Sequence, residues 1–216
     1  MASKKSKIRR IYDLLEDHFG DLKWWPAKTP FEVIIGAVLT QNTSWSNVEK
    51  AIGELNKKKL LTPKKIMALN SKRLAGLIRS SGYHRVKAER LKEVSRFVLD
   101  ECGGRLKKLG KEDTSSLREK LLRVKGIGPE TADSILVYAL GKPVFVVDAY
   151  TKRIFSRHNI VIENASYDEV QTLVENAMDP DTGTMNQFHA LLVETAKRFC
   201  RKRAPLCGEC PLGCTL

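Results

Sequence analysis

The sequence has no uninterrupted apolar run long enough to cross a bilayer, and no apolar signal core follows its basic start. We therefore expect a soluble, cytoplasmic protein without a membrane partner. Acidic residues are in deficit, because 25 Asp and Glu stand against 38 Lys and Arg, giving a formal charge of +13. Such an excess predicts a polyanionic partner, with nucleic acid first and an anionic membrane surface second. A generic basic protein is the remaining alternative.

The sequence also lacks the alternation of apolar and polar residues that half-buried strands show, and it has no low-complexity tract or repeat. Apolar residues recur instead at helical spacing, and 42% hydrophobic content argues against disorder. We predict an all-α fold in which residues 144–147 form a connector or a short strand. The expected helices are 8–19, 30–41, 47–55, 63–69, 71–78, 86–101, 114–124 (capped by Thr114 or Ser115), 129–140, 149–158, 166–177 and 184–199.

The stretch Leu121–Leu140 predicts two helices joined by a tight hairpin. Gly126 and Gly128 permit positive φ and leave room for a phosphate, and Ile127 between them can anchor the turn in the core. Lys125 adds a positive charge beside the same phosphate. We interpret the stretch as a sequence-independent DNA-binding element, with an ordinary glycine turn as the alternative.

Cysteine is scarce and unevenly placed, because four of the five cysteines lie in the last seventeen residues. Such crowding argues against a secreted disulfide framework and indicates one metal or cluster site. The spacing is Cys200-x6-Cys207-x2-Cys210-x3-Cys214. Thiolates suit both zinc and iron–sulfur chemistry, so the residues alone leave these two open. The four histidines show no paired spacing, and each is expected to be a surface or core residue.

The hairpin, followed by Val147-Asp148 and by Arg153, resembles the endonuclease III superfamily of helix-hairpin-helix DNA glycosylases. This resemblance places Asp148 at the catalytic position, where a carboxylate stabilises the oxocarbenium-like sugar or activates water. Without the resemblance, the position of Asp148 just before a predicted helix indicates an N-cap, and this role is compatible with catalysis. Glu130 occupies the position of the lysine nucleophile of bifunctional members. Because glutamate forms no Schiff base, we expect a monofunctional enzyme without efficient abasic-site lyase activity.

The N-terminal W-W-P and L-T-Q-N-T motifs resemble the endonuclease III-like 3-methyladenine DNA glycosylases of bacteria, which implies a prokaryotic source. An electron-rich aromatic pocket would bind a flipped, cationic alkylated purine. The implied base pocket is Trp24, Trp25, Pro26, Trp45 and Glu130. Core packing is the alternative role for the three tryptophans.

The resemblance further implies two DNA-inserting segments. Gln41 would fill the gap left by the flipped nucleotide, and Tyr83 with His84 would enter the opposite strand. It also decides for a [4Fe–4S] cluster over zinc, held by Cys200, Cys207, Cys210 and Cys214, although the family's last spacing is x5 rather than x3. The cluster would order the C-terminal loop.

The implied architecture has two helical lobes with a DNA cleft between them. Residues 23–142 would form a six-helix barrel-like lobe with the hairpin, and residues 1–22 with 143–216 a second lobe with the cluster loop. The protein would act as a monomer on double-stranded DNA that carries a damaged base. The alternatives are a glycosylase for oxidised pyrimidines, mismatched uracil or thymine, or mismatched adenine, and a non-catalytic DNA-binding module.

Overall fold

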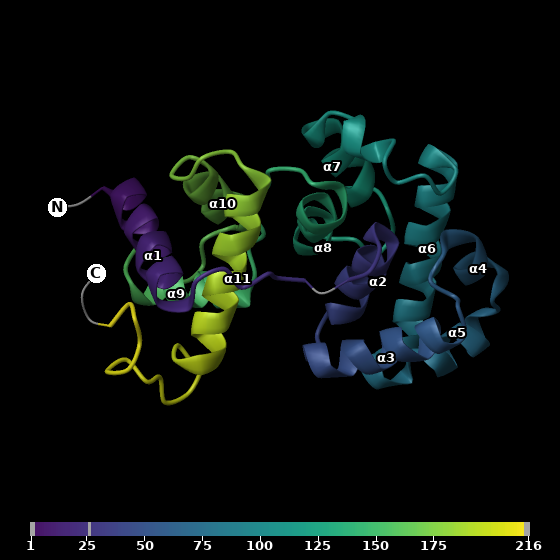
Figure 1. Cartoon of the computed structure of the whole chain (residues 1–216), viewed down its shortest axis with the longest axis horizontal. Helices are drawn as coiled ribbons and strands as arrows, with labels where there is room; N and C mark the ends of the chain where they lie inside the picture. The colour runs from purple at the N-terminus through teal and green to yellow at the C-terminus, as the bar shows by residue number, and fades with distance from the viewer. Residues whose placement is uncertain (1–2, 26, 214–216) are drawn as a thin grey trace. The chain divides into compact units, whose positions relative to one another are not determined.

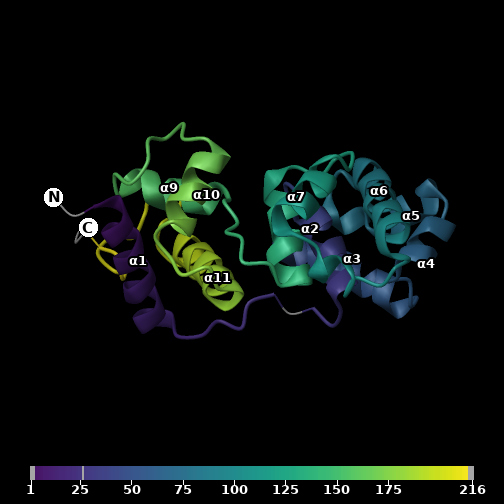
Figure 2. The same cartoon turned by 90° about the horizontal axis from the view of Figure 1, so that it is seen from above.

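The structure, a computed structural model, describes residues 3–25 and 27–213. These residues form helices and no strand, which confirms the all-α prediction. The chain divides into two compact units, residues 1–26 with 143–216 (unit 1) and residues 27–142 (unit 2). The chain passes between the units twice, once between α1 and α2 and once before α9 (Figures 1 and 2). Among the described residues, no helix combines the length and apolarity that a membrane span requires.

Unit 2 is built around one buried helix. Its elements are α2 (Pro30–Thr40), α3 (Trp45–Lys57), α4 (Pro63–Ala68), α5 (Ser71–Leu77), η1 (Arg79–Ser81), α6 (His84–Cys102), η2 (Leu109–Lys111), α7 (Thr114–Leu122), α8 (Pro129–Ser134) and the π-helix η3 (Ile135–Ala139). The helix α2 contacts α3, α6, α8 and η3, and nearly all its residues are buried. Thr29 caps it, and Pro30 occupies the first turn, where its missing N–H costs nothing.

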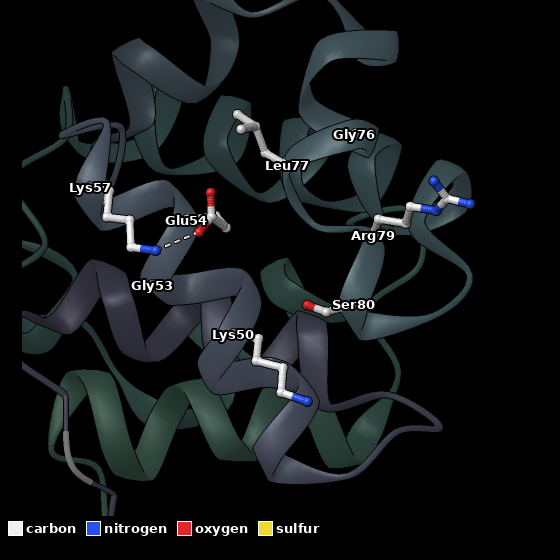
Figure 3. A pocket seen from close by; sticks show the side chains of 8 residues that line it. All are labelled: Lys50, Gly53, Glu54, Lys57, Gly76, Leu77, Arg79 and Ser80. Atoms are coloured by element: carbon white, nitrogen blue, oxygen red, sulfur yellow. Dashed lines mark hydrogen bonds and ion pairs between the residues drawn. The ribbon is translucent and has the colours of Figure 1, made fainter.

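One hollow of about 350 Å³ opens on unit 2, between α3 and the segment formed by α5 and η1 (Figure 3). The side chains of Lys50 and Arg79 point away from it, and Lys57 is ion-paired with Glu54 at 2.8 Å. No sequence-predicted site residue lines it. The charged side chains that line the hollow therefore do not point toward a common ligand position, and the hollow carries no functional inference.

Unit 1 joins the two ends of the chain in one helical core. It contains α1 (Lys4–Phe19), α9 (Ala149–Arg157), α10 (Tyr167–Glu175) and α11 (Thr182–Arg198). The helix α11 packs against α1 and α9, and α1 also contacts α10 (Figure 2). Phe188 of α11 lies in the centre, with its ring centroid 5.5 Å from those of Tyr12 and Phe145.

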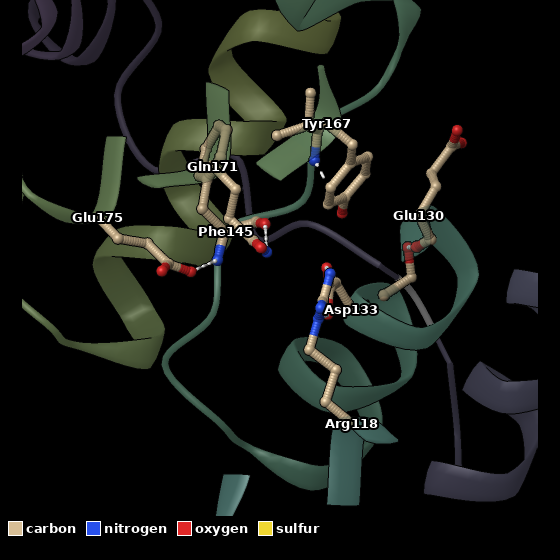
Figure 4. Close-up of polar contacts among 9 residues, drawn as sticks. Arg118, Glu130, Asp133, Phe145, Tyr167, Gln171 and Glu175 are labelled. Atoms are coloured by element: carbon tan, nitrogen blue, oxygen red, sulfur yellow. Dashed lines mark hydrogen bonds and ion pairs between the residues drawn. The ribbon is translucent and has the colours of Figure 1, made fainter. Parts of the chain in front are cut away.

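The segment 144–147 is an extended connector whose backbone is held by side chains rather than by another strand. Three residues on one face of α10 make these contacts (Figure 4). The N–H of Phe145 donates to Glu175 (2.9 Å), its carbonyl accepts from Gln171 (2.7 Å), and the N–H of Val147 donates to the Tyr167 hydroxyl (3.3 Å). The β-branched composition is therefore explained by burial, and the segment delivers Asp148 to the start of α9.

Several helices begin earlier than the sequence-based expectation: α1 begins at residue 4 rather than 8, α3 at 45 rather than 47, and α6 at 84 rather than 86. Asp113, rather than Thr114 or Ser115, caps α7 by accepting from the N–H of Ser116 at 2.9 Å. The helix α11 likewise begins at Thr182, behind the cap Asp181 and two residues before the expected start at 184. Both α7 and α11 are thus capped by an aspartate, and in α7 it replaces the predicted hydroxyl.

Candidate active site and DNA-binding loops

The hairpin lies between α7 and α8. Gly126 has φ +88, and a Cβ there would lie 2.5 Å from Cγ of Arg90, so only glycine fits. Ile127 is buried at 4% exposure, as predicted. Gly128 differs from expectation, because its φ of −99 is open to any residue and nothing lies within 4 Å of a Cβ. A side chain at Gly128 would therefore clash with nothing in the protein, and its absence leaves room only for a bound molecule beside the exposed Lys125.

A buried ion pair joins the two helices of the hairpin. Arg118 of α7 donates from Nε and Nη2 to the two carboxylate oxygens of Asp133 on α8, at 2.7 and 3.0 Å. Asp133 is fully buried, and the Arg118 side chain is 23% exposed. Bidentate geometry fixes both distance and angle between the helices. Glu130, one turn earlier on α8, is exposed (Figure 4).

Gln41 follows α2 and is held toward the hairpin. Its amide Nε2 donates to the Gly126 carbonyl at 3.2 Å and to Thr131 Oγ1 at 2.9 Å. Its Oε1 accepts from Nη1 of Arg90. The side chain predicted to fill the gap left by a flipped nucleotide is thus oriented by three partners within unit 2.

Tyr83 is the most exposed aromatic residue in the described chain, at 72%. It adopts a left-handed conformation (φ 45, ψ 30), which is strained for a residue with a bulky side chain. In this backbone conformation Tyr83 is the N-cap of α6, and its exposed ring lies next to His84, the first residue of the helix. This geometry suits insertion into a duplex, the role that the sequence analysis gave to both residues.

Asp148 caps α9 by accepting from the N–H of Thr151 at 2.8 Å. Its Oδ2 lies 3.6 Å from Nε2 of His189 on α11, and its side chain is 13% exposed. Burial opposes ionisation, but the imidazole of His189 and the Thr151 groups together hold the pKa of Asp148 below its usual value. Unit 1 therefore presents one ionised, directed carboxylate at a helix N-terminus.

His189 was not singled out by sequence analysis, which treated each histidine as a surface or core residue. It is buried at 6% exposure. It lies on another helix, far along the chain from Asp148, so no local motif could have paired them. The same holds for Arg118 with Asp133 and for the contacts of α10 to the connector.

The three tryptophans fall in different units. Trp24 and Trp25 belong to unit 1, whereas Trp45 begins α3 in unit 2; Pro26 lies outside the described residues. Trp25 has a left-handed φ of 70. The ammonium of Lys197 lies 5.2 Å from the ring centroid of Trp24. The Trp24 ring therefore already binds one cation on its face.

Three of the four C-terminal cysteines line one cavity of about 210 Å³ with Arg157, His158, Phe199 and Gly213; they are Cys200, Cys207 and Cys210. Cys214 lies outside the described residues. Among those described, no three His, Cys, Asp or Glu side chains are grouped closely enough to bind a single metal ion.

Arg157 donates to Cys200 Sγ at 3.2 Å and to the Arg201 carbonyl at 2.8 Å, so a cation already faces one sulfur. The three sulfurs are of the donor type that a thiolate-bound group requires, although the described side chains do not converge on one point. Cys102, in unit 2, donates instead to the Val98 carbonyl.

Known proteins are similar to this chain over nearly its whole length. A provisionally named DNA repair glycosylase of Methanocaldococcus jannaschii is 47% identical over 212 residues, or 97% of this chain and 96% of that protein. The crystal structure of an H. pylori 3-methyladenine DNA glycosylase bound to 1,N6-ethenoadenine is similar, with 31% identity and a TM-score of 0.76, covering 91% of this chain and 98% of the other. A trapped covalent endonuclease III–DNA intermediate gives 25% identity and a TM-score of 0.83, covering 98% and 94%.

The sequence profile of one family matches residues 35–180, which include both hairpin glycines and Asp148. Its description is HhH-GPD superfamily base excision DNA repair protein. The matched region covers more than half of the chain and spans parts of both units. The chain therefore belongs to the HhH-GPD superfamily of base excision DNA repair proteins, the endonuclease III-like helix-hairpin-helix DNA glycosylases.

Proposed function

We propose that this glycosylase is monofunctional and hydrolyses the N-glycosidic bond of alkylated purines such as 3-methyladenine in duplex DNA. The observation that carries the proposal is the ionised, largely buried side chain of Asp148 at the N-terminus of α9. Breaking the bond develops positive charge on the sugar, and a fixed carboxylate stabilises that charge or activates the attacking water. His189 keeps this carboxylate ionised and restricts its direction.

The absence of a lysine at the first turn of α8 supports hydrolysis without strand cleavage. Glu130 stands there, and its carboxylate cannot form a Schiff base with the sugar. Lys125 precedes the hairpin turn and is exposed beside Gly126, where it suits a phosphate better than a sugar carbon.

One solved structure supports a cationic purine as substrate, whereas the Trp24 ring, whose face already holds the Lys197 ammonium, does not by itself do so. The similar H. pylori structure is of a 3-methyladenine glycosylase. An N-alkylated purine is positively charged. This charge would favour its binding in an aromatic pocket and also makes the base a good leaving group.

DNA would be bound mainly through its backbone. The formal charge of +13 and the exposed hairpin glycines favour contacts to phosphates, which carry no sequence information. Binding should therefore weaken steeply as the salt concentration rises. Gln41, Tyr83 and His84 would enter the duplex where the base is flipped.

Cys200, Cys207, Cys210 and Cys214 would hold a [4Fe–4S] cluster with a structural role. The cluster would cross-link the C-terminal loop to the end of α11, where Arg157 of α9 donates a hydrogen bond to Cys200 Sγ. Bound zinc with no iron or sulfide would show the alternative.

The test uses duplex oligonucleotides that carry 3-methyladenine, 7-methylguanine, uracil, thymine glycol or 8-oxoguanine, analysed with and without hot alkali. We expect the methylated strands to break only after alkali, and Asp148→Asn to lose at least about 100-fold in single-turnover rate while still binding DNA. Cleavage without alkali would assign a lyase activity. Excision of another base would assign one of the rival substrates, and binding without excision a non-catalytic module.

A further inference from the structure

Lys87 of α6 is a fully buried lysine, at 1% exposure. Among the described residues it has no carboxylate partner, and its ammonium donates to two backbone carbonyls, those of Leu39 at 2.8 Å and Ser81 at 2.6 Å. Burial, with the nearby Arg90, lowers the pKa of Lys87 to about 8. Burying a charged group costs free energy, and the hydrogen bonds to the two carbonyls offset part of that cost.

The two carbonyls end the segments that lead to the DNA-inserting residues. Leu39 lies in the last turn of α2, two residues before Gln41, and Ser81 ends η1, two residues before Tyr83. Carbonyls at helix ends have no partner within the helix and need one from elsewhere. One ammonium therefore fixes both segments to the same point on α6.

Arg90 lies three residues after Lys87 and links a third segment. Its Nη1 donates to Gln41 Oε1, and Gln41 donates to the Gly126 carbonyl of the hairpin. The Arg90 side chain also lies where a Cβ of Gly126 would be. The hairpin turn thus packs against the same stretch of α6 that holds the other two segments.

We propose that Lys87 and Arg90 form a brace on α6 that fixes residues 39–42, 81–84 and 125–128 relative to one another. This inference rests on the proposed function, because it assumes that these three segments contact one DNA duplex. Both residues are positioning residues. They would hold Gln41, Tyr83 and the hairpin in the spacing that the bent duplex requires, so that less ordering is needed on binding.

The test compares Lys87→Met and Arg90→Met with Arg96→Met. Arg96 is an exposed cation on the same helix, so it controls for the change in charge. The first measurement is backbone amide hydrogen exchange in the whole protein without DNA. We expect Lys87→Met to accelerate exchange about tenfold or more at both 39–42 and 81–84. Arg90→Met should do so at 41–43 and 126–128 but not at Tyr83.

The second measurement is single-turnover excision at saturating enzyme, together with the DNA dissociation constant. A brace predicts a rate loss of about 10- to 100-fold for either variant, with a smaller change in affinity, because a displacement of about 1 Å has such an effect. Arg96→Met should leave both unchanged. Uniformly faster exchange across α2–α8, or unchanged exchange in the three segments, would overturn the brace.

Each half of the brace can be tested alone. If Lys87→Met fails to fold, the exchange of Arg90→Met at 41–43 and 126–128 decides, since Arg90 is only partly buried. Exchange needs no substrate. If wild-type protein excises no base, the proposed function fails, while the exchange pattern still supports or overturns the brace.

Discussion

The carboxylate of Asp148 and the imidazole of His189 lie 3.6 Å apart, on α9 and α11 of the same unit. Burial alone would raise the pKa of Asp148, and the imidazole is the main group that opposes it. His189 is therefore the largest single contribution that keeps the pKa of the candidate catalytic group below its usual value.

Replacing His189 with Gln should move the acidic limb of the pH–rate profile to higher pH. Wild type should keep activity until the pH falls through the lowered pKa of Asp148. Without the imidazole this pKa rises, so ionisation is lost earlier on acidification. Single-turnover rates across pH measure this shift. His18→Gln, which removes an imidazole packed on Phe19 and Phe199, is the control. An unmoved limb would contradict this role.

The two hairpin glycines should respond differently to alanine. Gly126→Ala meets both a positive φ and the Arg90 side chain, so we expect a loss of about 2 kcal/mol in unfolding free energy. Gly128→Ala meets neither and should change stability by less than about 1 kcal/mol. It should still weaken DNA binding, because its methyl group would project where the phosphate approaches. Equal stability losses would show that this assignment is wrong.

Asp133→Asn should lower the unfolding free energy by about 2–3 kcal/mol, since it removes the carboxylate charge that Arg118 binds through two hydrogen bonds in a largely buried site. Glu93→Gln breaks the exposed Arg96 pair and should cost less than about 0.5 kcal/mol. Denaturant titration of both variants measures the contrast. A small effect of Asp133→Asn would mean that other contacts hold α7 to α8.

The lowered pKa of Lys87 should make the stability of the protein depend on pH. The folded pKa of about 8 lies below the usual lysine value, so the unfolded chain binds more protons between these two pH values. Keeping the buried Lys87 protonated lowers the unfolding free energy by its full amount below about pH 8, and this loss disappears as the pH rises toward about 10.5. Thermal midpoints at about pH 7 and about pH 10 should show wild type gaining stability relative to Lys87→Met. A constant difference would contradict the lowered pKa.

Cys207→Ser should abolish bound iron and sulfide and lower the thermal midpoint, because the loop loses one proposed ligand. Cys102→Ser is the matched control, since this thiol hydrogen-bonds Val98 in unit 2. Chemical analysis of iron, sulfide and zinc in both purified variants measures the outcome. Full iron content in Cys207→Ser would exclude Cys207 as a ligand, and Cys214→Ser tests the short last spacing in the same way.

The features predicted correctly from sequence are those set by neighbouring residues. Ile127 is buried because it lies between two glycines of a hairpin, and Asp148 caps α9 because it directly precedes the helix. Where two adjacent residues competed for a cap, as Asp113 did with Thr114, the sequence pattern gave the wrong one. The network around Lys87 could not be predicted, because it depends on carbonyls contributed by separate segments.

The discontinuity of unit 1 has a consequence for the order of events during synthesis. The helix α1 is made first, but its partners α10 and α11 are made only after the whole of unit 2. Domains generally fold as units while the chain is still growing. Unit 2 can therefore form its core while α1 waits with its apolar face uncovered. In a nascent chain stalled before α10, the α1 residues that the complete protein buries would stay exposed to water; they are Ile8, Ile11 and Leu15.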